Sequence, residues 1–208
     1  MDPETRHQRL RNLVRQLNRQ RKQRGKQIDI LCNDLIEAQR DFIQRLGTIS
    51  MTASFYQSLL GLYSHSDVLD TAGRFLQEIL PETRIVFCLP QDGQCLLHRV
   101  VHAAPKNMME LEQHFDPETI DAIAKAQTRC DVDAMVSLGL QMNPSLLAEV
   151  TAITIPLIHG CLPQGFILLT RTQAQTFKSE ELIRAEALTG GLAQALSACP
   201  VASPTSED

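Results

Sequence analysis

The chain has 208 residues and a formal net charge of −4, which is room for one domain of ordinary size and an accessory segment. Aromatic residues make up only 4% and tryptophan is absent, which disfavours a stacking platform for single-stranded nucleic acid. Apolar runs are too short to span a bilayer, and the charged first residues do not resemble a secretory signal. We therefore expect a cytoplasmic protein whose six cysteines are reduced thiols.

The charge is divided unevenly along the chain. Residues 1–50 have a net charge of +5 and residues 51–208 a net charge of −9, and Arg6–Lys26 holds nine basic residues and no acidic one. A basic arm joined to an acidic body predicts two modules. We place them at residues 1–50, a basic helix, and residues 51–198, a folded domain.

A single long helix is predicted from Arg6 to Tyr63, because this stretch lacks proline. One heptad register fits it, and its two seam columns contain the apolar residues Leu10, Val14, Leu17, Ile28, Leu31, Leu35, Phe42, Ile49, Tyr56, Leu59 and Tyr63. Because a helix cannot bury so narrow a stripe alone, we predict that the chain forms a homodimer. The interface would comprise residues 28–63, as a parallel coiled coil, and the C-terminal helix. The alternative is that the helix folds back on its own domain.

The N-terminal part of this seam contains charge. Arg21 and Arg24 fall in the seam beside Gly25, and paired buried guanidiniums repel each other. We expect the coil to splay N-terminal of about Lys26. The basic arm Arg6–Lys26 carries enough charge for a salt-sensitive contact with nucleic acid or anionic lipid, but most charged helical runs are solvated faces, and that interpretation is favoured.

The body is predicted to begin with a helix and a β-hairpin. Asp67–Leu80 shows a helical apolar face, and Pro81 stops it. Arg84–Leu89 reads as a strand, Pro90–Gly93 as a turn with an Asp-Gly signal, and Cys95–His102 as the returning strand.

The middle of the body gives a weaker pattern. Met108–His114 and Pro117–Gln127 are predicted as short helices, the second beginning at Asp116-Pro117. Thr128–Val136 is ambiguous between helix and strand. Pro144–Glu149 is predicted as a helical turn.

The last part of the body gives a clear pattern again. Ala152–Ile158 and Gly165–Thr170 are predicted strands joined by a polar turn at His159–Gln164, and a helix runs from Ser179, its expected cap, to about Ala198. Cys199–Asp208 is expected to be a disordered tail. The order of elements predicts an α+β fold, an antiparallel sheet with helices on both faces.

The last 45 residues of the body carry a resemblance. The residues concerned are Thr154–Leu157, Gly160, Gly165–Leu169, Phe177–Leu182 and Leu188–Ala195, preceded upstream by Leu76–Pro81 and a hydrophobic strand. This pattern resembles the GAF domain family over roughly residues 51–198. The resemblance implies a small-molecule sensor and dimerisation module joined to a long signalling helix, with the ligand between the sheet and segment 103–150.

The residue patterns of two ligand-binding classes of GAF domains can be compared with this sequence. Bilin-binding members usually have a cysteine followed by histidine, and none of the six cysteines here is followed by histidine. Cyclic-nucleotide members carry an Asn-Lys pair where this chain has Thr170-Arg171, although Phe177, Glu180 and Glu181 match the later part of that pattern loosely. No cofactor follows from the sequence.

Candidate site residues are few. Cys95, His98 and His102 superficially suggest a metal site, but on a strand the two histidines stand about 13 Å apart, and Cys95 points the other way, so a shared ion is disfavoured. We name Cys88, His98, His102 and Cys130 as candidate ligand-binding residues. The alternative is that the histidines are polar strand residues and the cysteines inert thiols.

Three functions remain open from the sequence. The first is a dimeric cytoplasmic sensor that couples a small molecule to the coiled coil, and passes the signal to a protein partner. The second is a GAF-like scaffold that has lost its pocket and only dimerises or docks partners. The third, a minority hypothesis, is an enzyme or redox sensor using Cys88, Cys95, Cys130 or Cys161, which needs an accessible thiolate of low pKa.

Overall fold

The computed structural model describes residues 3–91, 94–100, 110–143, 147 and 149–199. The chain divides into two compact units, residues 1–50 and residues 51–208, and each is described by itself. Within the described part of the chain, no helix combines the length and the apolar character that crossing a membrane requires.

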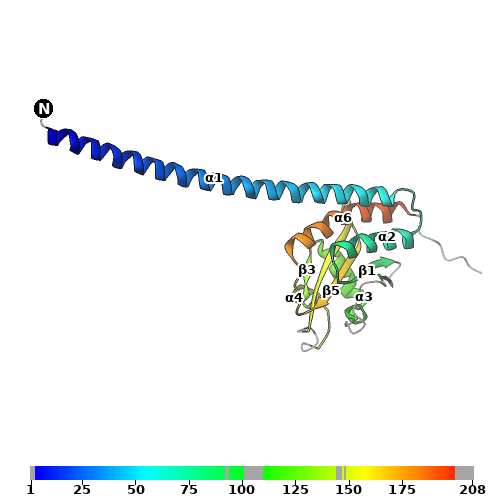
Figure 1. Cartoon of the computed structure of the whole chain (residues 1–208). Coiled ribbons are helices and arrows are strands. Elements are labelled where there is room, and N and C mark those ends of the chain that lie inside the picture. Colours follow the sequence, from blue (N-terminus) through cyan, green and yellow to red (C-terminus); the bar gives the residue numbers. More distant parts are fainter. Residues whose placement is uncertain (1–2, 92–93, 101–109, 144–146, 148, 200–208) are drawn as a thin grey trace, which may run out of the picture. The chain divides into compact units, whose positions relative to one another are not determined.

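The first helix, α1, runs from Pro3 to Leu59 and continues through Gly25 and Gly47 without a break (Figure 1). The predicted long helix is therefore confirmed, but it ends four residues before Tyr63. Gly61 has a φ of +83°, outside the helical region, and the Leu62 amide donates to the Leu59 carbonyl at 3.3 Å in a tighter turn. Tyr63, which the heptad pattern included, thus lies beyond the helix.

The body contains a five-stranded sheet in the order β2-β1-β5-β4-β3, in which every neighbouring pair is antiparallel. This confirms the predicted α+β fold. The strands are β1 Arg84–Gln91, β2 Gln94–Arg99, β3 Cys130–Asp131, β4 Val150–His159 and β5 Leu162–Thr172.

Both hairpins are tighter than predicted. Pro90 and Gln91, expected in a turn, belong to β1 and pair with Cys95 and Gln94. In the second hairpin His159 pairs with Leu162, so only Gly160 and Cys161 remain in the turn, where Gly160 has a φ of +62°. A two-residue turn of this kind needs positive φ, which glycine supplies.

The helices of the body are α2 His65–Ile79, the 3₁₀ helix η1 Leu111–His114, α3 Pro117–Ala126, α4 Val132–Ser137 and α6 Ser179–Ala198. The predicted start of α3 is confirmed, since the Asp116 side chain accepts from the Thr119 amide at 2.6 Å. The cap of α6 is Lys178 rather than Ser179, because the Lys178 amide donates to the Glu181 carboxylate at 3.0 Å.

The segment that the sequence left ambiguous contains both kinds of structure. Cys130 and Asp131 form β3, which pairs with β4, and α4 follows immediately, its first turn capped by the Asp131 side chain, which accepts from the Ala134 amide at 2.9 Å. The predictions for residues 101–109, for most of 144–149 and for the tail beyond Cys199 fall outside the described residues.

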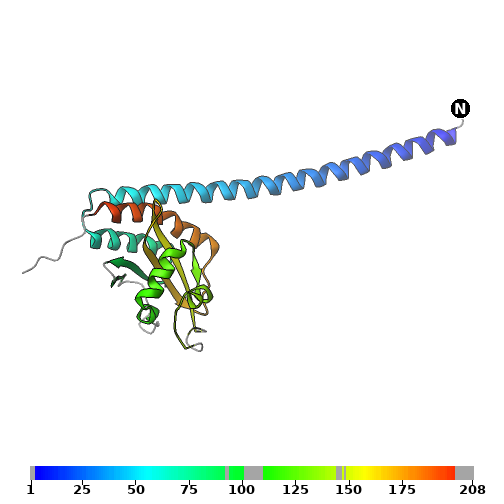
Figure 2. The same cartoon turned by 180° about the vertical axis from the view of Figure 1, so that it is seen from behind.

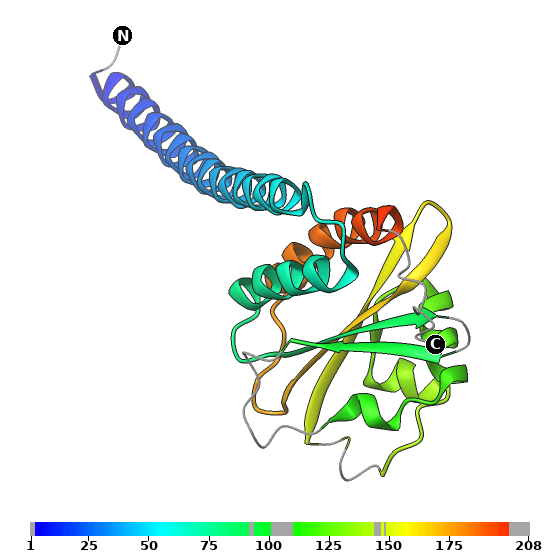
Figure 3. The same ribbon diagram turned by 90° about the vertical axis from the view of Figure 1, so that its right-hand side faces the viewer.

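The sheet separates two apolar cores. One face packs against α2, α6 and the end of α1, with Phe55, Phe87 and Leu188 among its buried residues. The other face packs against η1, α3 and α4, with Phe166 and Met135 among its buried residues. Figure 3 shows α2 and α6 on one side of the sheet and the green helices on the other, and Figure 2 shows α3 lying across the second face.

A buried guanidinium ties β5 to the start of α6 on the first face. Arg171 is 5% exposed; its Nε donates to Thr83 Oγ1 at 2.7 Å and its Nη1 to Glu181 Oε2 at 2.9 Å. Its guanidinium carbon also lies 4.6 Å from the centre of the Phe177 ring. The residue that departs from the cyclic-nucleotide pattern is therefore a structural link between three segments.

Candidate functional site

Four charged side chains meet on the second face of the sheet, and we call them the charged cluster: Arg84, Arg99, Glu110 and Glu112. Arg84 and Arg99 come from the neighbouring strands β1 and β2, where Arg99 stands opposite Val86. Because side chains alternate along a strand, both arginines project from the face that carries Val86 and Cys88. The two glutamates come from η1 and the residue before it.

The charged cluster is organised around the Glu112 carboxylate. Its Oε1 accepts from Arg84 Nη2 and, at 3.0 Å, from Arg99 Nε, while the Glu112 side chain is 0% exposed. Glu110 lies outside this pair and contacts Arg84 Nη2 at 3.3 Å and Arg99 Nη2 at 3.4 Å. A carboxylate this buried is stable only because two cations compensate its lost hydration.

Three buried polar atoms of this region have no hydrogen-bond partner among the described residues. They are Arg84 Nε, Glu112 Oε2 and Thr170 Oγ1. Thr170 stands directly opposite Arg84 in the pairing of β5 with β1, so its hydroxyl shares the face of the charged cluster. Buried polar groups in folded proteins are nearly always satisfied, so this place offers a donor, an acceptor and a hydroxyl to a polar molecule.

The charged cluster adjoins the second apolar core. Val86, Leu168 and Phe166 are each 1% exposed or less and belong to the core beneath α3 and α4. The unpartnered polar atoms therefore lie beside packed apolar side chains.

The two glutamates of the charged cluster stabilise the protonated form of Arg84. Burial, the largest single influence, lowers the pKa of Arg84, but the hydrogen bond and charge of Glu112 and the charge of Glu110 outweigh it and raise the pKa above its ordinary value. Arg84 therefore stays protonated, and the cluster presents two fixed cations against two carboxylates.

Cys88 lies in the second apolar core beside Cys95. The hydrogen bond with the Cys95 thiol, burial, and the nearby charges of Cys95 and Glu112 raise the pKa of Cys88 well above its ordinary value. The hydrogen bond from Cys88 lowers the pKa of Cys95, against the effect of burial and with help from the backbone of Leu89. Of this pair of thiols, Cys95 is thus the one whose surroundings favour the thiolate.

The other predicted site residues are separated by the sheet. Cys130 shares the second face with Cys88 and donates weakly to the Thr128 carbonyl at 3.5 Å. His98 projects from the opposite face, where its Nε2 lies 3.0 Å from Asp70 Oδ1 and its ring packs near Phe87. His102 lies outside the described residues. The structure therefore brings Cys88 and Cys130 to one face and His98 to the other, and ligand binding by these residues stays a prediction.

Sequence reasoning missed the charged cluster, although a signal was present. Arg84 occupies the same face of its strand as Val86 and Cys88, and a charged residue on an otherwise buried face needs a partner. The partner, Glu112, is 28 positions away, in a segment that we predicted only as a short helix.

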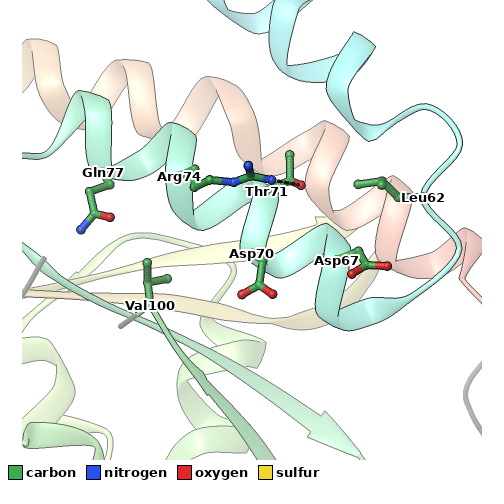
Figure 4. Close-up of a pocket in the computed structure, with 7 residues that line it drawn as sticks. All are labelled: Leu62, Asp67, Asp70, Thr71, Arg74, Gln77 and Val100. Carbon is green, nitrogen blue, oxygen red and sulfur yellow. Dashed lines mark hydrogen bonds between the residues drawn. The ribbon is translucent and has the colours of Figure 1, made fainter. Parts of the chain in front are cut away.

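A groove lies along α2 (Figure 4). This groove of about 500 Å³ is lined by Leu62, Asp67, Asp70, Thr71, Arg74, Gln77 and Val100. The Asp70 and Asp67 carboxylates and the Arg74 guanidinium give it both signs of charge, and Arg74 is held to the Thr71 hydroxyl at 3.2 Å. It contains one unpartnered buried atom, Gln77 Nε2, against three at the charged cluster, so we take the charged cluster as the main candidate.

A metal centre has no support in the described residues. Across residues 3–91, 94–100, 110–143 and 149–199, no three His, Cys, Asp or Glu side chains meet in a way that could hold a metal ion.

Comparison with solved structures identifies the fold. The chain is similar to the GAF/HD domain protein of Geobacter sulfurreducens, with a TM-score of 0.51 and 16% identity over 67% of this chain and 95% of that one. It is also similar to the GAF domain of a putative sensor histidine kinase from Pseudomonas syringae pv. tomato, with a TM-score of 0.51 and 13% identity over 77% and 92%. The predicted GAF-like fold is therefore confirmed.

A third similar structure is the chromophore-binding domain of an unusual bacteriophytochrome from R. palustris, with a TM-score of 0.51 and 12% identity. This chain is covered over 72% of its length and spans only 60% of that fragment. No family model matches the sequence, and comparison with curated proteins gives no match either.

Proposed function

We propose that this chain is a cytoplasmic sensor that binds a small polar molecule at the charged cluster and acts as a dimer. The observation that carries the proposal is the convergence of three unpartnered buried atoms, from Arg84, Glu112 and Thr170, on one face of the sheet. The fold is shared with a domain of a putative sensor histidine kinase and with a chromophore-binding domain, which supports a sensory role.

The free atoms define what the ligand must offer. Glu112 Oε2 needs a hydrogen-bond donor, Arg84 Nε needs an acceptor, and the Thr170 hydroxyl takes either. A compound with a donor and an acceptor side by side meets all of these needs. The established polar contacts of Glu112 with two arginines are not broken by such a ligand.

The ligand proposal predicts that Thr170→Val weakens ligand binding without weakening the fold. The hydroxyl has no partner among the described residues, so an apolar replacement of the same shape is expected to change the free energy of unfolding by less than about 1 kcal/mol or to raise it. A thermal-shift screen of the full chain against nucleotides, amino acids and small carboxylic acids identifies compounds that raise the melting temperature, and the variant is expected to bind them about tenfold more weakly.

The matched control is Thr154→Val, on the same face of the sheet. The Thr154 hydroxyl already has a partner, the Cys130 carbonyl at 3.5 Å, so this variant is expected to keep the ligand response of the unchanged chain. If no compound raises the melting temperature and native mass spectrometry shows no bound mass, the ligand part of the proposal is wrong.

The dimer is proposed to form through the apolar stripe of α1. Its seam residues are exposed in the single chain, among them Ile28 at 59%, Leu31 at 66% and Leu35 at 60%. An isolated helix cannot bury such a stripe, and a second copy aligned in parallel buries it knob into hole. In the proposed mechanism, ligand binding alters the packing around α6 and the end of α1, and the dimeric helix carries the change to a protein partner.

Substituting two seam residues is expected to separate the dimer. Leu31→Lys with Leu35→Lys places charges in both columns of the seam, so the chain should sediment as a monomer in sedimentation velocity. The control is Ile30→Lys with Ile43→Lys, two residues of similar exposure, 58% and 68%, that lie outside the seam. That control should remain dimeric; a monomer for the unchanged chain would contradict the proposal.

A further inference from the structure

The first part of α1 carries positive charge that forms no ion pair with any side chain the structure describes. Of its nine basic residues, seven have side chains that the structure describes, and all are exposed: Arg11, Arg15, Arg19, Arg21, Lys22, Arg24 and Lys26. None of them takes part in an ion pair found within the described residues. A solvated helix face ordinarily mixes both signs at i, i+4 spacing, and this one contains no acidic residue.

The neutral polar residues of the same segment are also of one kind. Between and beside the basic residues stand Gln8, Asn12, Gln16, Asn18, Gln20, Gln23 and Gln27. Guanidinium and carboxamide groups are the side chains that bind phosphates and the edges of bases in the major groove of DNA.

The position of the segment in the helix supplies a geometry. α1 is continuous through Gly25, so the basic segment prolongs the helix whose apolar seam begins at Ile28. Arg21 and Arg24 occupy the seam between the two parts, and in a dimer they would force the helices apart. Two continuous basic helices that diverge from a dimeric coiled coil can enter the major groove from opposite sides.

The dimensions agree with this geometry. The segment Arg6–Lys26 spans about 30 Å at the usual helical rise, close to one turn of B-DNA at about 34 Å. Each helix is therefore long enough to cross the major groove, about 12 Å wide, and reach the phosphates that border it.

We propose that the segment Arg6–Lys26 of the dimer binds double-stranded DNA. Composition alone favours a solvated face, but the unbroken helix through Gly25 and the charged interruption of the seam give the segment a form that fits the duplex. A membrane surface is less suitable, because the segment has only Leu10, Leu13, Val14 and Leu17 as apolar residues and no aromatic one. The inference rests on the proposed dimer.

The test is fluorescence anisotropy of a labelled duplex of about 30 base pairs, titrated with the full chain over a salt series. About seven phosphate contacts would give a slope of log affinity against log salt near −6. The variant replaces Arg11, Arg15, Arg19 and Lys22 with glutamine, all outside the seam. It is expected to bind about 30-fold or more weakly, with a shallower slope, because each segment loses four of its nine basic side chains.

Two controls separate charge from other effects. Exchanging lysine and arginine at the same four positions keeps the charge and should leave affinity within about threefold of the unchanged chain. Arg40→Gln removes a basic residue elsewhere in α1 and should have no effect on binding.

The outcomes distinguish this inference from the proposal on which it rests. A dimer by sedimentation that does not bind the duplex, that binds equally with the glutamine variant, or that prefers phosphatidylserine vesicles or single-stranded RNA overturns the inference and leaves the dimer standing. A monomer that still binds the duplex overturns the diverging-helix arrangement together with the dimer. A dimer with the steep salt dependence, lost in the glutamine variant, supports both.

Discussion

Gly165→Ala is expected to lower the free energy of unfolding by about 3 kcal/mol or more, because two costs combine at this position. A Cβ atom there would lie 2.2 Å from the Cys88 carbonyl oxygen and 3.1 Å from Leu89 Cα, so the backbone of β1 would have to move, which overpacking measurements place at about 1–3 kcal/mol. Gly165 also has a φ of +138°, a conformation that costs an alanine about 1–3 kcal/mol more.

Gly160→Ala provides the matched control in the same hairpin. Gly160 also has a positive φ, +62°, but a Cβ there would meet nothing within 4 Å. This variant should therefore show only the conformational cost, about 1–2 kcal/mol. Urea unfolding of both variants measures the difference, and equal losses would show that Gly165 is not needed for the close approach of β5 to β1.

Arg171→Ala is the second prediction with a large effect, an expected loss of about 3–5 kcal/mol. The change removes the donor to Thr83 and Glu181 and leaves a carboxylate with a side chain only 20% exposed without its cation. The control is Arg129→Ala, which breaks the ion pair of Arg129 with Glu186, whose side chains are 47% and 40% exposed; that change should cost less than about 1 kcal/mol.

The dependence of this link on pH follows from Glu181. Burial, the largest influence, raises the pKa of Glu181, but the hydrogen bonds from Arg171 and the Lys178 amide and the charge of Arg171 outweigh it, so the pKa lies below its ordinary value. A carboxylate whose folded pKa is lowered stabilises the fold fully above the ordinary glutamate pKa and loses that contribution as the pH falls through the folded value. The Arg171→Ala and unchanged chains should therefore converge in stability under acid, and a constant difference would contradict the assignment.

The sequence predicted the elements that depend on local pattern. The β-branched and apolar run Arg84–Leu89, the Asp116-Pro117 start and the long stretch without proline before Leu59 each express a preference carried by neighbouring residues, and the structure confirms all three. The segment around Cys130 could not be assigned, because its two-residue strand exists only through pairing with β4.

The candidate site depends on contacts between residues that are far apart in the sequence, which a local sequence pattern cannot predict. Glu112 is buried because two arginines from other elements reach it, and Arg171 meets Thr83 across 88 positions of sequence. Thr170 and Arg171 could be recognised from sequence only as a departure from the cyclic-nucleotide pattern. The pairing of β5 with β1 places Thr170 opposite Arg84, beside the charged cluster, and brings Arg171 to Thr83.

That pairing has a mechanical consequence. Thr83 and Arg84 are consecutive in the chain, as are Thr170 and Arg171, and in each pair one side chain faces the charged cluster while the other joins the link to α6. The two sides of the sheet therefore share the same peptide units at these positions. A bound molecule that moved the backbone at Arg84 and Thr170 would therefore also move Thr83 and Arg171, which link β5 to the start of α6.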